Sequence, residues 1–334
     1  MEDLAQKISS LILDYGNGQF GRLDADHVIR WVMQFEEDDR LVVLQETNRI
    51  LKNNYITRAS FQDYIATLVA SEKFAGGNLH SFWSTVSLLN IQQKGNSQSE
   101  LVGLLSQQVG DNFGLPPSIN SNSSSFIYID DFLFSGSRLV NDMRAWIEAS
   151  SPQKCHVDVV FMGWYQSGIW YAQKALKGIA EKCKKDITFK YWTKDGFKLE
   201  NRLFRKDFSH VFWPDNTILE HQGAREYISG FKREISLRSP NNEKNQIFSR
   251  SRRSQYENAM VKAGLQILSF CDNPSPVMKP LGFNPFEGFG FGSTVFSFRN
   301  CPNNNPLAFW WGDPKQPYTT LGRWYPLMQR ITYE

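Results

Sequence analysis

The sequence predicts an α/β fold: a mostly parallel sheet with flanking helices, preceded by an N-terminal helical module. Three observations lead to this class. Short apolar segments alternate with helical segments from about residue 84 to 192, as in parallel strands joined by crossover helices. Several apolar segments are almost continuous, which is typical of strands covered on both faces. The first 75 residues show helical spacing throughout.

The composition fits a folded protein of two domains, or of one large domain with an appendage. Of the 334 residues, 41% are hydrophobic and 21% charged, so a sizeable core can form and global disorder is excluded. The net charge of +3 does not favour nucleic acid or an anionic membrane as a partner. The four cysteines form no C-x-x-C pair, the start lacks a signal peptide, and no apolar run reaches about 18 residues. We therefore expect a cytoplasmic protein without a membrane span or a protein-held metal.

The first predicted domain, residues 1–75, is a helical module with three apolar faces. These faces comprise Val28, Ile29, Trp31, Val32 and Phe35; Leu41, Leu44, Thr47, Ile50 and Leu51; and Phe61, Tyr64, Ile65 and Leu68. A winged-helix-like module would also fit, but the segment carries no basic stripe. A docking or structural role is therefore favoured over DNA contact, which stays open as an alternative.

The second predicted domain, residues 76–334, carries the sheet. Its strands are expected at residues 86–91, 126–129, 157–162 and 187–192. Its helices are expected from residue 97, around 139–147, and over 166–183, 223–235 and 254–270. Ser97 with Glu100, and Ser254 with Glu257, have capping-box spacing. Residues 282–311, dense in Gly, Pro, Phe and Trp, are expected to form loops and short strands.

The most informative segment lies at the end of the second strand. Asp130 and Asp131 stand at its carboxyl end, where open α/β sheets bind ligands. Ser135, Gly136 and Ser137 then open a helix whose N–H groups and dipole favour an anion. Glycine lets the backbone approach closely, and the serines add hydroxyl donors. An anion cradle beside two carboxylates predicts a sugar-phosphate ligand.

A second loop follows the first strand and also precedes a helix. Lys94 supplies a positive charge, Gly95 permits a close backbone approach, and Ser97 lies at the helix start with its N–H donors. Simpler interpretations of both loops stay open. The two acids could end a strand and cap the next helix, and the Lys94 loop could be a solvated turn.

The motif resembles the signature of type I phosphoribosyltransferases: an apolar strand, two acids, three residues, then Thr or Ser followed by Gly before a helix. By this resemblance, Asp130 and Asp131 would hold the ribose 2′- and 3′-hydroxyls of phosphoribosyl diphosphate. Ser135, Gly136 and Ser137 would hold its 5′-phosphate. The resemblance also implies transfer at the ribose anomeric carbon, a glycosyltransferase activity of the phosphoribosyltransferase type.

The second loop, with Lys94, Gly95 and Ser97, occupies the place of the family's diphosphate loop. Mg²⁺ would accompany the substrate diphosphate. Arg138 departs from the family's usual Thr, and would either add a phosphate contact or indicate a different 5′ group. Phe132 and Phe134 replace the usual small aliphatic residues.

The sequence is similar to the divergent phosphoribosyltransferase-like effectors of bacterial anti-phage conflict systems, including retron-type systems. The helical leader, the Asp-Asp-Phe-x-x-Ser-Gly motif and the C-terminal Asn- and Trp-rich segment carry this similarity. It implies a toxic effector held in check by a protein or nucleoprotein partner. The alternatives are a non-catalytic phosphoribosyl or nucleotide sensor, and a docking protein in a nucleoprotein complex. The C-terminal segment, with Trp310 and Trp311, could form a hood over a base or belong to turns and core.

Overall fold

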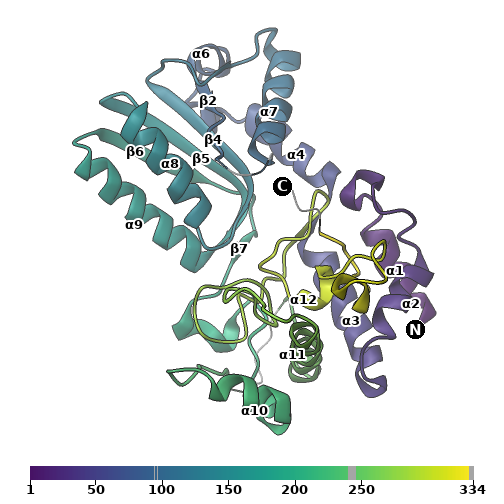
Figure 1. Cartoon of the computed structure of the whole chain (residues 1–334). Helices are drawn as coiled ribbons and strands as arrows, with labels where there is room; N and C mark the ends of the chain where they lie inside the picture. Colours follow the sequence, from purple (N-terminus) through teal and green to yellow (C-terminus); the bar gives the residue numbers. More distant parts are fainter. Residues whose placement is uncertain (94, 96, 240–245, 331–334) are drawn as a thin grey trace. The chain divides into compact units, whose positions relative to one another are not determined.

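The computed structural model describes residues 1–93, 95, 97–239 and 246–330 in two compact units (Figure 1). Unit 1 combines Met1–Arg58 with Asn201–Glu334, and unit 2 is Ala59–Glu200. The helical segment of residues 1–75 is therefore distributed over both units. The division into domains at residue 75 stays a prediction.

Unit 2 is built on a parallel sheet with the strand order β3-β2-β4-β5-β6, and β7 pairs with β5. The strands are β2 (Ser87–Leu89), β3 (Ser118–Ile119), β4 (Ser125–Leu133), β5 (Lys154–Tyr165), β6 (Asp186–Trp192) and β7 (Lys198–Leu199). The predicted fold class and all four predicted strands are confirmed. The sequence missed β3 and β7, because two residues are too few to show a period.

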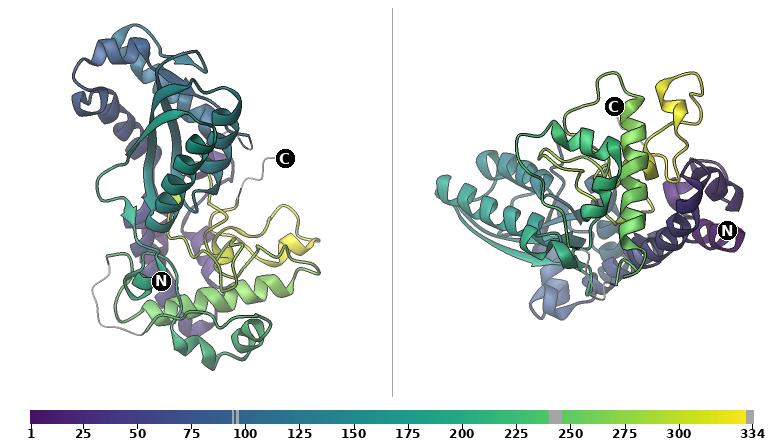
Figure 2. Two further views of the ribbon diagram at one scale, coloured as in Figure 1. Left: turned by 90° about the vertical axis from the view of Figure 1, so that its left-hand side faces the viewer. Right: turned by 90° about the horizontal axis from the view of Figure 1, so that it is seen from below.

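Helices cover this sheet. They are α4 (Arg58–Val69), α5 (Glu72–Ala75), α6 (Leu79–Thr85), α7 (Ser97–Phe113), α8 (Ser137–Ala149) and α9 (Gln166–Lys182). Figures 1 and 2 show α8 and α9 side by side on one face of the sheet. Apolar residues of these two helices form one core with the facing strand residues. The nearly continuous apolar runs of β4 and β5 reflect burial on both faces.

The strand order places a topological switch point between β2 and β4. From β2 the chain passes through α7 to β3 on one side, and from β4 it passes through α8 to β5 on the other. Parallel crossovers are right-handed, so the two connections leave for opposite faces of the sheet. Ligands of open α/β sheets bind outside the carboxyl ends of the strands at such a point. The loops that follow β2 and β4 are the two loops selected from the sequence.

Unit 1 joins the N-terminal helices to the C-terminal third of the chain. Its helices are α1 (Glu2–Leu11), α2 (Ala25–Val32), α3 (Glu37–Asn54), α10 (Gln222–Ser229), α11 (Arg253–Ser269) and α12 (Leu307–Trp310). Its 3-10 helices are η1 (Tyr15–Gly18), η2 (Leu203–Phe208), η3 (Asn216–Glu220) and η4 (Thr320–Arg323). The short strands β1 (Tyr55–Ile56) and β8 (Phe296–Ser297) pair in parallel. Both views of Figure 2 show α11 as a long helix, which packs against α3, α10 and α12.

Tryptophan side chains tie the two ends of the chain together in this unit. The indole N–H groups of Trp31 and Trp324 donate to the Ala308 carbonyl at 2.8 and 3.0 Å. Trp310 and Trp311 are buried in the same core. Of the two interpretations of these residues, burial in the core is the one that the structure shows. A hood formed by the neighbouring asparagines stays a prediction.

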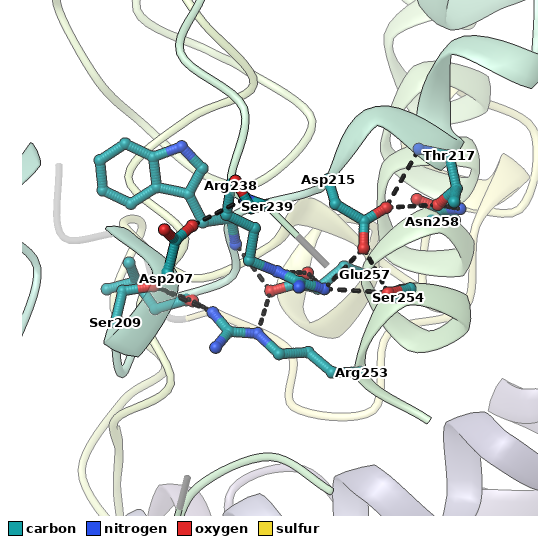
Figure 3. A network of polar contacts seen from close by, with 12 residues as sticks. Asp207, Ser209, Asp215, Thr217, Arg238, Ser239, Arg253, Ser254, Glu257 and Asn258 are labelled. Carbon is teal, nitrogen blue, oxygen red and sulfur yellow. Dashed lines mark hydrogen bonds and ion pairs between the residues drawn. The ribbon is translucent and has the colours of Figure 1, made fainter. Parts of the chain in front are cut away.

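Unit 1 also contains a buried ion network around the start of α11 (Figure 3). Arg238 contacts Asp215 at 3.1 Å and Glu257 at 2.7 Å, and Arg253 contacts Glu257 at 2.9 Å. Ser254 donates to Asp215 and accepts from Arg238. The predicted capping box at Ser254 and Glu257 is therefore wrong. Glu257 balances the charges of two buried arginines, and Ser254 forms hydrogen bonds with Asp215 and Arg238, instead of capping the helix.

One helix ends earlier than expected. The helix predicted over 223–235 spans Gln222–Ser229, and Gly230 follows it. Within the described residues, no helix is long and apolar enough to cross a membrane.

Candidate functional site

The two acids lie within β4, not after it. The sequence placed the strand end at residue 129, but pairing with β5 continues as far as Leu133, opposite Trp164. Side chains of adjacent strand residues point to opposite faces, so Asp130 and Asp131 do not share an environment. Asp130 is 3% exposed, whereas Asp131 is partly exposed. Asp131 is therefore the more accessible carboxylate for a ligand hydroxyl.

The loop after β4 is fixed by close packing of backbone against backbone. Gly136 has a φ of +79°, and a Cβ there would lie 2.6 Å from the Gly168 carbonyl oxygen in α9. A Cβ on Gly168 would in turn lie 1.9 Å from the Phe134 carbonyl oxygen. Glycine at both positions is thus required by the packing of this loop on α9. This requirement exists without any ligand.

The two serines of the motif lie at the exposed N-terminus of α8. Ser135 Oγ accepts the N–H of Ser137 at 3.4 Å and donates to the Ser137 hydroxyl at 3.2 Å. The hydroxyls therefore occupy the region where first-turn N–H groups attract anions. Two exposed hydroxyls beside a helix N-terminus can rotate to bind phosphate oxygens.

The structure brings this loop together with the loop after β2. Arg138, in the first turn of α8, donates from Nη1 to Ser97 Oγ in the first turn of α7 at 3.4 Å. The N–H of Gln93 donates to the Asp142 carboxylate of α8 at 3.2 Å. Gly95 has a φ of +88°, which favours glycine at that point of the loop. Lys94 lies outside the described residues.

Two glutamines that the sequence analysis missed shape the loop after β2. Gln98 Oε1 accepts the N–H groups of Ile91 and Gln92 at 2.7 and 2.8 Å. Gln92 Oε1 in turn accepts the N–H of Gln98 at 2.9 Å and Gln92 Nε2 donates to Ser97 Oγ at 2.9 Å. Ser97 thus bonds to Gln92, which was not its predicted capping partner. A pair of uncharged side chains gives no distinctive sequence signal.

Asp142 is the second feature that the sequence analysis missed. It is 3% exposed and accepts hydrogen bonds from the Gln93 N–H and, at 3.4 Å, from the Tyr128 hydroxyl. Burial raises the pKa of this carboxyl, an effect opposed by the Gln93 bond and by the nearby Arg138. Its position between Leu139 and Met143 on the apolar face of the helix was a usable signal, since buried acids need partners.

Phe132 and Phe134, which are bulkier than the usual residues of the phosphoribosyltransferase motif, belong to an aromatic cluster. The Phe132 ring lies 5.1 Å from that of Phe134, 5.5 Å from Tyr165 and 5.9 Å from Phe197. A Cβ on Gly163 would lie 2.5 Å from the Phe132 and Phe197 rings, so glycine makes room for them. The phenylalanines at these motif positions therefore pack with one another and with neighbouring aromatic rings.

The donors of this site suit a metal ion that arrives with a diphosphate. Among the described residues, no group of three or more His, Cys, Asp or Glu could hold a metal ion. Mg²⁺, however, is usually bound through one or two carboxylates together with substrate phosphates and water. Asp131, with a partly exposed carboxylate, fits that need.

One of three comparisons with known proteins finds a match. No curated protein and no solved structure matches the chain. The family model PRTase-CE matches residues 28–330, which include both loops, both acids and the described part of unit 1 after Val28. The chain therefore belongs to the PRTase-CE family and is a phosphoribosyltransferase-like protein.

Proposed function

We propose that the protein acts on phosphoribosyl diphosphate or a nucleotide and transfers the phosphoribosyl group. With phosphoribosyl diphosphate as donor, the bond between the anomeric carbon and the diphosphate oxygen breaks, and its electron pair leaves with the diphosphate. With a nucleotide as donor, the bond between the anomeric carbon and the base nitrogen breaks, and its electron pair leaves with the base. A bond from an acceptor to the anomeric carbon forms, and the acceptor loses its proton. The observation that carries the proposal is the meeting of two helix-opening loops at the switch point, one of which follows the strand that carries Asp131.

Different residues of the site would bind different parts of the substrate. Asp130 and Asp131 would orient the ribose hydroxyls, with Asp131 more accessible. Ser135, Gly136 and Ser137 would hold the 5′-phosphate at the start of α8. The transition state resembles an oxocarbenium ion, so the protein mainly positions the sugar and stabilises the leaving group.

The other loop would receive the diphosphate. Lys94, Gly95 and Ser97 belong to it, and Arg138 reaches it from α8. Mg²⁺ bound with the diphosphate would neutralise charge that develops on the leaving group. Of the two acids, Asp131 is the partly exposed one, and it lies closer in sequence to the loop of Ser135.

Release of pyrophosphate from phosphoribosyl diphosphate tests the reaction. The purified protein is incubated with Mg²⁺ and a panel of bases and nucleotides, and the Asp131→Asn variant is compared. We expect release that falls at least about 100-fold in the variant, since positioning groups contribute on that scale. Asp186→Asn is the matched control, because Asp186 lies on β6 with a side chain that is 66% exposed.

A wild-type protein that releases no pyrophosphate with any acceptor, and no free base from any nucleotide in the panel, would contradict the transferase proposal. If calorimetry then shows binding that Asp131→Asn abolishes, the second candidate function holds: a sensor of phosphoribosyl ligands. The observation that favours the sensor is Arg138, whose donation to Ser97 puts a cation where the resembling enzymes have a smaller residue. Loss of neither binding nor biological activity in the variant would favour a docking protein.

The biological role that we propose is that of a toxic effector in anti-phage defence of the retron type, restrained by a protein or nucleoprotein partner. The similarity of the motif and helical leader to such effectors supports it. Induced expression without the partner should arrest growth, and Asp131→Asn should abolish the arrest. Arrest that persists in a variant with no measurable activity would contradict a toxic enzyme.

A further inference from the structure

Asp142 joins three elements of unit 2 through one buried carboxylate. It lies on α8, one turn after Arg138, and its Oδ1 accepts the N–H of Gln93 in the loop after β2. Its Oδ2 accepts the hydroxyl of Tyr128, a fully buried residue of β4. A strand, a helix and a loop from another part of the chain therefore meet at this one side chain.

The two loops of the site are fixed by different means. The loop of Ser135 and Gly136 packs backbone against backbone on α9. The loop after β2 is held to α8 by two hydrogen bonds between described residues, Gln93 to Asp142 and Arg138 to Ser97. Arg138 is exposed, so its 3.4 Å bond is weakened by water, whereas Asp142 is buried. Asp142 is thus the stronger of these two attachments.

We propose that Asp142 is a positioning residue that holds the loop after β2 in the place where it meets the diphosphate of the substrate. This inference rests on the proposed function. Asp142 does not touch the substrate in this assignment and acts through the backbone of Gln93. The 5′-phosphate loop does not depend on it, because that loop is fixed by its contact with α9.

The proposal predicts that loss of the Asp142 carboxylate weakens the binding of two ligands that share a ribose 5-phosphate to different degrees. Phosphoribosyl diphosphate uses both loops, whereas ribose 5-phosphate uses only the Ser135 loop and the acids. Asp142→Ala should weaken binding of phosphoribosyl diphosphate by at least about tenfold, the usual scale for removing a group that orients a binding residue. Binding of ribose 5-phosphate should change by less than about twofold.

Conservative variants separate positioning from general stability. Asp142→Asn keeps an oxygen that can accept from Gln93 and should retain most of the affinity for the diphosphate. Tyr128→Phe removes the other donor and should leave the affinities for both ligands close to wild type. Glu148→Ala changes an exposed acid of the same helix and is the matched control. If Asp142→Ala does not fold, the pair Asp142→Asn and Asp142→Leu replaces it, since leucine keeps the volume and removes the acceptor.

Amide hydrogen exchange of peptides that contain residues 91–98, measured without ligand, tests the attachment itself. Faster exchange there in Asp142→Ala, but not in Asp142→Asn, would support the role of Asp142 in holding the loop. If the wild-type protein nevertheless bound no sugar diphosphate, only the proposed function would fail. Unchanged exchange would overturn the proposal. Equal loss of both ligands, or failure of asparagine to restore affinity, would overturn it as well.

Discussion

Buried carboxylates of the two units differ in the groups that surround them. In unit 1, Asp215 and Glu257 face two arginines and several hydroxyl and amide donors (Figure 3). In unit 2, Asp142 receives one backbone N–H and one phenol, and the nearest cation, Arg138, donates to Ser97. The first setting balances charge in the interior, and the second leaves a carboxylate held by neutral donors.

The pKa values follow this difference. Burial raises the pKa of Asp215, but hydrogen bonds from Ser254 and Thr217 and the charge of Arg238 outweigh burial, so the pKa is lowered overall. At Asp142 burial prevails, and the pKa is raised. A buried carboxylate can therefore lie in a core where cations match its charge, as at Asp215, or accept from neutral donors, as at Asp142.

The largest expected effect is the loss of a cation from the unit 1 network. Arg253→Ala leaves Glu257 in the interior with one ion-pair partner fewer and removes the donor to Ser209 and to the Val211 carbonyl. We expect a loss of about 3–5 kcal/mol in the free energy of unfolding, measured by urea titration. Lys7→Ala, which breaks an exposed pair with Asp3, should cost about 0–1 kcal/mol. Equal losses of unfolding free energy in the two variants would contradict a larger contribution from the buried network than from an exposed ion pair.

The next effect tests how the loops of unit 2 are fixed. Gly168→Ala forces a Cβ against the Phe134 carbonyl oxygen, and overpacking of this kind costs about 1–3 kcal/mol. Gly178→Ala is the control, because it lies in the same helix with no atom within 4 Å of the added Cβ. It should stabilise unit 2 by about 0.5–1 kcal/mol. Both values come from thermal or urea unfolding, and destabilisation by both variants would refute the backbone-packing explanation.

The smallest effect is in the dependence of stability on pH. The lowered pKa of Asp215 contributes stability that is present above its unfolded pKa of about 3.9 and is lost as the pH falls through the folded pKa. The raised pKa of Asp142 has the opposite sign: its contribution is greatest in acid and is lost as the pH rises through the folded pKa.

Peptide-resolved hydrogen exchange between about pH 2 and pH 7 can measure both contributions, because this range includes the region below the unfolded pKa of Asp215. Relative to wild type, Asp215→Asn should flatten the loss of protection in unit 1 on acidification. Asp142→Asn should remove a gain of protection in unit 2 over the same range. Changes of the same sign in the two variants would show that the two carboxylates do not differ as described.

Local patterns were enough to predict most elements of unit 2. Apart from the two-residue strand β3, the strands and helices between Ser87 and Trp192 follow from periodicity, because each buries a face that its own sequence defines. The helix starts after the first two predicted strands, and the two acids of β4, were also found this way. Their chemical roles remain predictions.

Contacts between distant residues could not be predicted. Asp142 pairs with Gln93 across 49 positions, and Ser254 and Glu257 engage Asp215 and Arg238 instead of capping their own helix. For Ser254 and Glu257, the local motif predicted partners nearer in sequence. The buried surroundings selected the distant ones, because an unmatched charge in the interior costs more than an unfilled cap.

By itself, the sequence determined the alternation of strands and helices, the acid pair and the Ser-Gly helix start, since these depend on neighbouring residues. The tertiary structure decided that the loops after β2 and β4 meet, that Gly136 is needed for packing on α9, and that Trp310 belongs to a core. Such facts depend on strand order and on which surfaces are buried together. Both arise only when segments far apart in the chain pack against each other.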